Sequence, residues 1–382
     1  MWSQVDIFEM CIGDGNDLTD EDLAAADAAV DKLFSVFYDN PKLAKAVRNA
    51  AKKYDAAGMA DKAMELRRTN VEDSPNNVAA MLSQMDIIYS CIDSNDVNDA
   101  AVDAEVDKLL HTFADQPTLP RRVYYIGNHY RKKDKYNRAI HFYQLVGEKW
   151  PKDDFALTSR VEIGKIHIQL GEDEAVTAVI DKMITDFNDH TRLPVAVFKI
   201  GEEYYYKAAD GGADLNSKAE AKDYYRKAKG VWERIITESA NTNAEVTKDA
   251  YYFIAVCLRR TGRYEEAIAY YQTVVDNWPN YKYAWSAQCL IGECFERLQE
   301  SGVLPEAEAE PIIELAYKQV IENYPECSLA GHACLKLAEM ELKKGRNLEA
   351  AVYYELFLTL APSDPRVKSV KARLESLGGQ SK

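Results

Sequence analysis

The 382-residue sequence has no run of about 20 consecutive apolar residues, the length that a membrane-spanning helix requires. Its first residues do not form the charged, apolar and small-residue segments of a secretion signal. We therefore expect no direct membrane insertion. The compartment stays open between cytoplasm and periplasm. Met1-Trp2-Ser3-Gln4 aligns with Met81-Leu82-Ser83-Gln84 of a later repeat, which fits a chain cut from a longer protein as well as one that starts with its first helix.

Positive charge is scarce. The chain has 47 Lys and Arg against 62 Asp and Glu, a net charge of −15. Nucleic-acid binding needs a basic stripe that neutralises phosphates, so no nucleic-acid partner is expected. Arg121-Arg122, Arg131-Lys132-Lys133 and Lys135 form the one dense basic patch, which fits a solvated face or a local acidic partner.

Cysteines are few and odd in number: seven, spread over the whole chain. Cys11, Cys91, Cys257 and Cys289 fall on apolar stripes of expected helices, where small buried side chains explain them better than disulfides do. Cys289 and Cys294 have no neighbouring pattern of metal ligands. We therefore expect no metal and no other cofactor.

Catalytic motifs are also missing. The sequence has no G-x-S-x-G elbow, no H-E-x-x-H pair, no glycine-rich phosphate loop and no spaced Cys/His set. Asp14-Gly15-Asn16-Asp17 and its copy Asp93-Ser94-Asn95-Asp96 resemble a calcium loop but lack the Gly required at the sixth position. Capping loops between helices explain them better, and the chain is predicted not to be an enzyme.

What the sequence does contain is a repeated unit. Its clearest copy reads Val123-x-x-Ile126-Gly127-x-x-Tyr130, Ala139-x-x-x-Tyr143 and Trp150-Pro151, and it returns as Tyr251-x-x-Ile254-Ala255-x-x-Leu258, Ala267-x-x-x-Tyr271 and Trp278-Pro279. The large apolar residues of the first segment and the small residue beside them form a shallow socket. The Ala of the second segment fits into this socket, so that the two helix backbones can approach closely. The Pro ends the second helix because it has no N–H to donate. Each copy therefore predicts a helix-turn-helix.

Weaker copies extend this unit over most of the chain. The copies around Ile200-Gly201 and Ile291-Gly292 need extra residues between their helices, which the turn-prone run from Asp210 to Asp214 supplies in the first. A longer period pairs one degenerate hairpin with one well-marked hairpin, since Val106-Asp107-Lys108-Leu109 returns as Ile180-Asp181-Lys182-Met183. Thr19 to Asp22 predicts a helix start with a capping hydroxyl.

These repeats predict an all-α fold, a right-handed α-solenoid of about nine helix-turn-helix repeats with a C-terminal capping helix. We expect a single continuous array over residues 1–382. Its parts are degenerate repeats in 1–118, better-marked repeats in 119–362, and a capping helix and tail in 363–382.

The unit resembles the tetratricopeptide repeat, in which about 34 residues read W-x2-L-G-x2-Y, A-x3-F and P. The pattern from Ala267 to Pro279 is similar to bacterial outer-membrane assembly lipoproteins and Tol-Pal-associated repeat families, although no lipid-attached Cys lies near the start of this chain. The chain also departs from chaperone-binding repeats that clamp a C-terminal carboxylate with Lys and Asn, because Tyr124 and Tyr252 stand at those positions.

The resemblance implies a non-catalytic scaffold that binds protein or peptide segments in a concave groove lined by the first helix of each hairpin. The acidic chain favours a partner of basic or mixed charge. The alternative is a regulatory or sensory repeat module of a larger bacterial envelope protein whose catalytic or membrane domain is absent from this chain. The oligomeric state is left open. Tyr and Arg are enriched at binding hot spots. The residues expected on the concave face are Tyr124, Asn128, Arg131, Phe198, Glu202, Tyr205, Tyr252, Val256 and Arg259, followed by Cys289, Glu293 and Glu296.

Overall fold

The computed structural model describes residues 6, 19–94, 97–210, 218–238 and 244–378. These residues form helices joined by short turns and contain no strand, so the prediction of an all-α helical-repeat fold is confirmed. None of their helices is both long and apolar enough to cross a bilayer. The segments predicted as loops at Asp14 to Asp17 and at Gly211 to Asp214 lie outside the described residues, as do Asn95 and Asp96.

The chain divides into two compact units, residues 1–166 and 167–382, with the division inside α9 (Asp154–Leu170). Each unit is described by itself, and the single array over residues 1–382 stays a prediction. The first unit contains α2 (Asp20–Phe37), α3 (Leu43–Ala56), α4 (Ala60–Asp73), α5 (Val78–Asp93), α6 (Asp99–Thr112), α7 (Leu119–Arg131), α8 (Tyr136–Lys149) and most of α9. The second contains α10 (Asp173–Asp186), α11 (Leu193–Asp210), α12 (Lys218–Glu238), α13 (Ala244–Thr261), α14 (Tyr264–Asn277), α15 (Ala284–Glu300), α16 (Glu306–Asn323), α17 (Ala330–Lys343), α18 (Asn347–Leu360) and α19 (Val367–Gly378).

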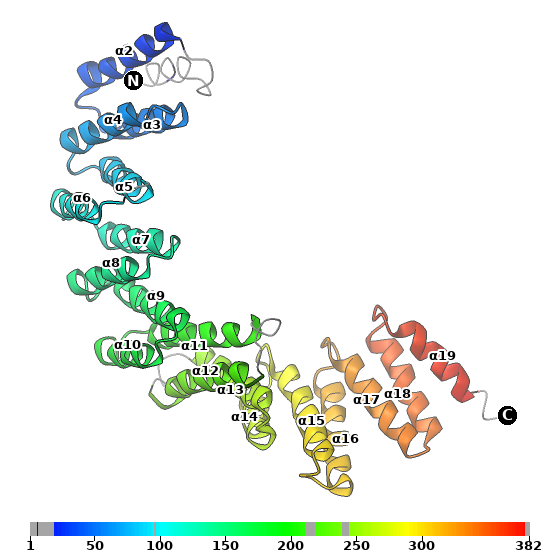
Figure 1. The fold of residues 1–382 in the computed structure, drawn as a ribbon. Coiled ribbons are helices and arrows are strands. Elements are labelled where there is room, and N and C mark those ends of the chain that lie inside the picture. The colour runs from blue at the N-terminus through cyan, green and yellow to red at the C-terminus, as the bar shows by residue number, and fades with distance from the viewer. Residues whose placement is uncertain (1–5, 7–18, 95–96, 211–217, 239–243, 379–382) are drawn as a thin grey trace. The chain divides into compact units, whose positions relative to one another are not determined.

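Within each unit the helices pair into hairpins that follow one another in chain order (Figure 1). α7 packs on α8, α13 on α14, and α17 on α18, as the repeat pattern predicts. First helices of successive hairpins also touch, as α3 does with α5, α5 with α7, and α11 with α13. Each unit therefore has one face built from first helices. The predicted C-terminal cap corresponds to α19, which packs on α18.

The small residue of each socket accommodates an aromatic ring of the second helix. A Cβ added to Gly127 would lie 2.7 Å from Tyr143 Cε1, and one added to Gly292 would lie 3.0 Å from the Tyr317 ring. One added to Gly201 would lie closer still to a ring atom, the indole Nε1 of Trp232. Ala139 and Ala267, predicted at the close approach, are fully buried. Sequence pattern and packing therefore agree on which positions hold each hairpin together.

Turns and helix ends follow the residues that the sequence offers for them. Gly171 and Gly262 adopt φ values of +77° and +85° between the helices of their hairpins. This left-handed conformation costs residues with a side chain more free energy than it costs glycine. α8 and α14 end directly before Trp150-Pro151 and Trp278-Pro279. α2 begins at a capping box, in which Thr19 Oγ1 accepts from the Asp22 N–H at 3.1 Å.

The extra residues expected in two hairpins go largely into longer helices. α15 and α16 have 17 and 18 residues, and only a short turn separates them, whereas α8 and α14 have 14 residues each. α11 and α12 have 18 and 21 residues. The prediction that the extra residues of the Ile291-Gly292 copy lie between its two helices is therefore wrong. Helical residues satisfy their own backbone hydrogen bonds and bury an extra turn, which a long loop would not do.

Three junctions, α2/α3, α6/α7 and α10/α11, carry the same polar contact. At each of them a carboxylate on one helix accepts a hydrogen bond from a tyrosine on the next helix. The same carboxylate also forms an ion pair with a cation on the helix after that. The three instances are Asp27 with Tyr54 and Lys62, Asp99 with Tyr130 and Arg138, and Asp173 with Tyr204 and Lys227. The recurrence matches the longer period predicted from the sequence.

Candidate functional site

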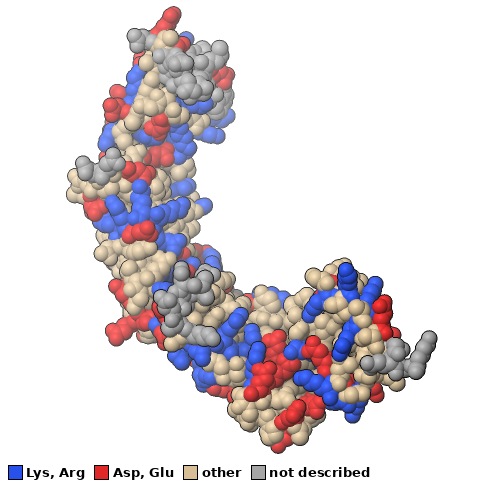
Figure 2. Space-filling model, turned by 45° about the vertical axis from the view of Figure 1, so that its right-hand side comes forward, with Lys and Arg blue, Asp and Glu red and all other residues tan. Residues whose placement is uncertain are grey.

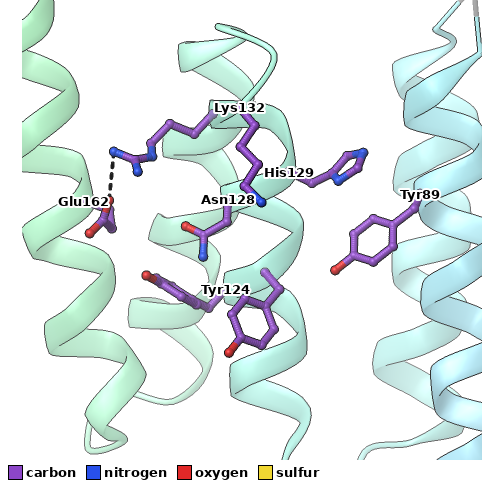
Figure 3. A pocket seen from close by; sticks show the side chains of 8 residues that line it. Tyr89, Tyr124, Asn128, His129, Lys132 and Glu162 are labelled. Atoms are coloured by element: carbon purple, nitrogen blue, oxygen red, sulfur yellow. Dashed lines mark ion pairs between the residues drawn. The ribbon is translucent and has the colours of Figure 1, made fainter.

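The first unit contains an open pocket of about 410 Å³ on its face of first helices. α7 supplies its floor, α5 one wall and α9 the other, as Figure 3 shows. We call it the α7 pocket, and its lining residues are Tyr89, Tyr124, Tyr125, Asn128, His129, Arg131, Lys132 and Glu162. It therefore brings together three residues predicted for the concave face: Tyr124, Asn128 and Arg131.

Tyrosine rings make the apolar part of the α7 pocket. The ring of Tyr124 lies 5.5 Å from that of Tyr143 on α8 and 5.2 Å from that of Phe155 on α9, so packing fixes its orientation. Asn128 accepts a hydrogen bond from Tyr143 Oη at 2.6 Å. Burial raises the pKa of Tyr89 to about 12 and also raises the pKa of Tyr124. Both phenols therefore stay protonated at neutral pH and keep a hydrogen-bond donor.

On the α5 side, two contacts fix the position of the His129 imidazole. It stacks on Tyr89 with ring centroids 4.6 Å apart, and its Nε2 lies 2.8 Å from Asp93 Oδ1. Asp93 also pairs with Lys133 Nζ at 2.7 Å. Burial acts to raise the pKa of Asp93, but the hydrogen bonds from Lys133 and His129 outweigh it and lower the pKa. The carboxylate therefore stays charged and anchors this wall.

On the α9 side, Arg131 Nη1 lies 3.1 Å from Glu162 Oε2. Glu162 is largely buried and has a second cation, Lys165 Nζ, at 3.7 Å. The single acidic residue of the lining is thus already neutralised, and Figure 3 marks its pair with Arg131.

Lys132 differs from the other charged residues of the lining. Its side chain is exposed, and Figure 3 shows it reaching along α7 toward Asn128. No carboxylate in the described part of the chain pairs with its ammonium group, whereas His129, Arg131 and Lys133 each have one. The α7 pocket therefore offers one uncompensated positive charge beside three aromatic rings.

The six residues predicted on α11 and α13 are placed differently. Phe198, Tyr252 and Val256 are only 8%, 9% and 6% exposed. Phe198 stacks on Trp232 at 5.2 Å, and Tyr252 stacks on Tyr283 at 4.7 Å. These side chains pack between helices and leave little surface for a ligand.

The other members of this second set also have interaction partners. Tyr205 packs against Tyr225 and Phe253 with centroids 5.6 and 5.7 Å away. Arg259 pairs with Glu293 at 3.4 Å, and Glu202 is partly buried with an interaction of its own. A ligand-binding role for these six residues stays a prediction.

Sequence reasoning missed five members of the site: Tyr89, Tyr125, His129, Lys132 and Glu162. Tyr89 and Glu162 lie on α5 and α9, the first helices of degenerate hairpins, where no repeat pattern marks the concave positions. His129 and Lys132 neighbour the predicted Asn128 and Arg131 on α7, and the basic patch that contains Lys132 was the available signal.

Comparisons with known proteins concern the repeat. The sequence model of the tetratricopeptide repeat matches residues 206–282. A comparison with curated protein sequences finds no match. Many solved structures resemble the chain, and three of them serve as examples. The C-terminal part of a tetratricopeptide-repeat protein from Cytophaga hutchinsonii is 16% identical, over 75% of this chain and 97% of that one, with a TM-score of 0.42.

YrrB, described as a tetratricopeptide-repeat protein with an unusual peptide-binding site, is 18% identical over 60% of this chain and 97% of its own, with a TM-score of 0.35. The tetratricopeptide-repeat domain of P58(IPK) is 16% identical over 98% of this chain and 99% of its own, with a TM-score of 0.30.

Proposed function

Because this chain carries tetratricopeptide repeats, we propose that it is a non-catalytic protein-binding module and that its α7 pocket holds a short segment of a partner protein. Stacked helical repeats typically present extended surfaces to other proteins. The segment that fits carries a carboxylate side chain close to an apolar or aromatic one.

The uncompensated charge of Lys132 is the observation that carries this proposal. A carboxylate of the partner would pair with this ammonium group without displacing an existing ion pair, since Arg131 and His129 already have Glu162 and Asp93. The rings of Tyr89, Tyr124 and Tyr125 offer an apolar surface within the same lining. Aromatic residues beside a cation are the composition of many binding hot spots.

The lining supports binding rather than chemistry. It holds three phenols, an amide, an imidazole, two cations and one neutralised carboxylate. Its histidine is held between a ring and Asp93, and the pocket offers no serine or cysteine nucleophile for it to activate. The chain as a whole carries a net charge of −15, so a segment of mixed charge fits better than a purely acidic one.

The test is a selection from a random peptide library displayed against the full chain. The selected peptides should share an acidic residue within a few positions of an aromatic or large apolar residue. Lys132→Ala should weaken binding of such a peptide by about 1 kcal/mol or more, roughly a fivefold to tenfold rise in Kd.

Lys149→Ala is the matched control. Lys149 is an exposed lysine at the end of α8, outside the α7 pocket, and no described carboxylate pairs with it. Its removal should leave Kd unchanged. Equal Kd values for the Lys132→Ala protein and the unmodified chain would refute the proposed site.

A further inference from the structure

In the second unit, side chains of two different hairpins bring a thiol, a carboxylate and an imidazole together. Cys289 and Glu293 lie one turn apart on α15, and His332 lies near the start of α17. One ligand atom from each, all within 4.8 Å of one another, makes a cluster that could hold an ion. From the geometry we propose that Cys289, Glu293 and His332 form a zinc-binding site.

The set of donor atoms selects the class of ion. Thiolate sulfur and imidazole nitrogen are ligands for zinc and its close relatives, whereas magnesium and calcium take oxygen ligands almost alone. Zinc lies about 2.0 to 2.3 Å from such atoms, so they need to approach by only a small side-chain movement. Three protein ligands leave the fourth tetrahedral position to water.

Two features of the surroundings favour a ligand at this place. His332 Nε2 is buried and has no hydrogen-bond partner among the described residues. An orphaned buried nitrogen costs free energy that coordination would recover. Cys289 is fully buried, and Arg259 Nη1 holds Glu293 Oε2 at 3.4 Å while the carboxylate keeps a second oxygen. Such an outer partner orients a metal ligand.

Metal binding at this site would release one proton. Binding replaces the S–H bond of Cys289 with a bond from sulfur to the ion, and the proton passes to solvent. The thiolate and the Glu293 carboxylate then carry the negative charges next to the ion, and Arg259 stays paired with that carboxylate. Glu293 is about one-third exposed, which gives the ion a path from solvent to the buried thiol.

The position of the site in the fold has a structural consequence. An ion held by α15 and α17 would connect the first helices of two successive hairpins, which the sequence alone could not predict because His332 is far from Cys289 along the chain. Zinc should therefore raise the melting temperature of the chain, since it binds only the folded arrangement.

The test uses the full chain, freed of metal by a chelator and titrated with Co²⁺ as a spectroscopic probe for zinc. We expect one equivalent to produce intense visible bands of tetrahedral cobalt and a thiolate-to-cobalt charge-transfer band. One equivalent of Zn²⁺ should remove them. Cys289→Ala and His332→Ala should abolish the bands, and Glu293→Gln should weaken binding about tenfold or more.

Cys294→Ala is the matched control, because Cys294 is equally buried on the same helix and lies outside the cluster. Its bands should be unchanged, and circular dichroism of each variant shows whether it is folded. Absence of the charge-transfer band in the unmodified chain overturns the proposal. The same band in Cys289→Ala, or its loss in Cys294→Ala, overturns it as well.

Discussion

Gly201 leaves room on α11 for the indole of Trp232, the largest fully buried side chain among the described residues. The indole Nε1 donates to the carbonyl oxygen of Phe198 at 3.1 Å, and its ring stacks on that of Phe198. The missing Cβ at this position therefore lets a large ring sit against the backbone of the preceding helix.

Gly201→Ala should lower the free energy of unfolding. The added methyl group would overlap the indole, which has neighbours on α11 and α13 and cannot move aside freely. Overpacking of this kind costs about 1 to 3 kcal/mol. The measurement is chemical denaturation followed by circular dichroism at 222 nm, a wavelength for helix.

Gly230→Ala, in the same hairpin, should instead raise the free energy of unfolding. Gly230 lies exposed in α12, and no atom comes within 4 Å of an added Cβ. Alanine is the better helix former, so this variant should gain about 0.5 to 1 kcal/mol. If both variants change stability in the same direction, the socket at Gly201 has been assigned wrongly.

Between elements, the recurring contact at Asp173 couples α10 to the next hairpin. Lys227 Nζ lies 2.7 Å from one carboxylate oxygen, and Tyr204 Oη donates to the other at 2.7 Å. Burial acts to raise the pKa of Asp173, but the hydrogen bonds from Lys227 and Tyr204 outweigh it and hold the pKa below its ordinary value of 3.8.

This lowered pKa predicts a pH dependence. The folded chain binds the proton of Asp173 less readily than the unfolded chain does, so the stabilisation is complete above pH 3.8 and is lost as pH falls through the lowered value. Asp173→Asn should cost at most about 1 kcal/mol near neutral pH, because the side chain is 43% exposed and solvent screens the pair.

The difference between Asp173→Asn and the unmodified chain should then shrink below about pH 4, measured as denaturation midpoints over a pH series. Asp189→Asn serves as the control, because Asp189 is exposed in the turn before α11 and no described cation pairs with it. A difference that stays constant down to pH 2 would show that Asp173 is not the titrating group.

Hairpins were predictable because their contacts are local. Ala139, Gly127 and Tyr143 recur at fixed spacing, since a helix period and a close approach dictate which residues fit. The α7 pocket was only partly predictable. Tyr124 lies on a well-marked helix, but Tyr89 and Glu162 come from degenerate hairpins, whose packing tolerates other residues and so leaves no pattern.

At the scale of the whole chain, the net negative charge favours a basic partner, whereas the unpaired cation of the α7 pocket favours an acidic group. Lys and Arg are interspersed with Asp and Glu on the face of each unit that Figure 2 shows. Neither sign dominates that face, so the net charge by itself selects no particular partner. An unpaired cation such as Lys132 therefore counts for more in recognition than the net charge of −15 does.

The α7 pocket as the binding site is tested most directly by exchanging charges across it. A selected peptide is compared with a variant in which lysine replaces its acidic residue, each titrated calorimetrically into the unmodified chain and into Lys132→Glu. The original peptide should bind Lys132→Glu at least about tenfold more weakly, because like charges then face each other. The lysine peptide should recover most of that loss. If Lys132→Glu binds both peptides as the unmodified chain does, the partner segment does not lie in the α7 pocket.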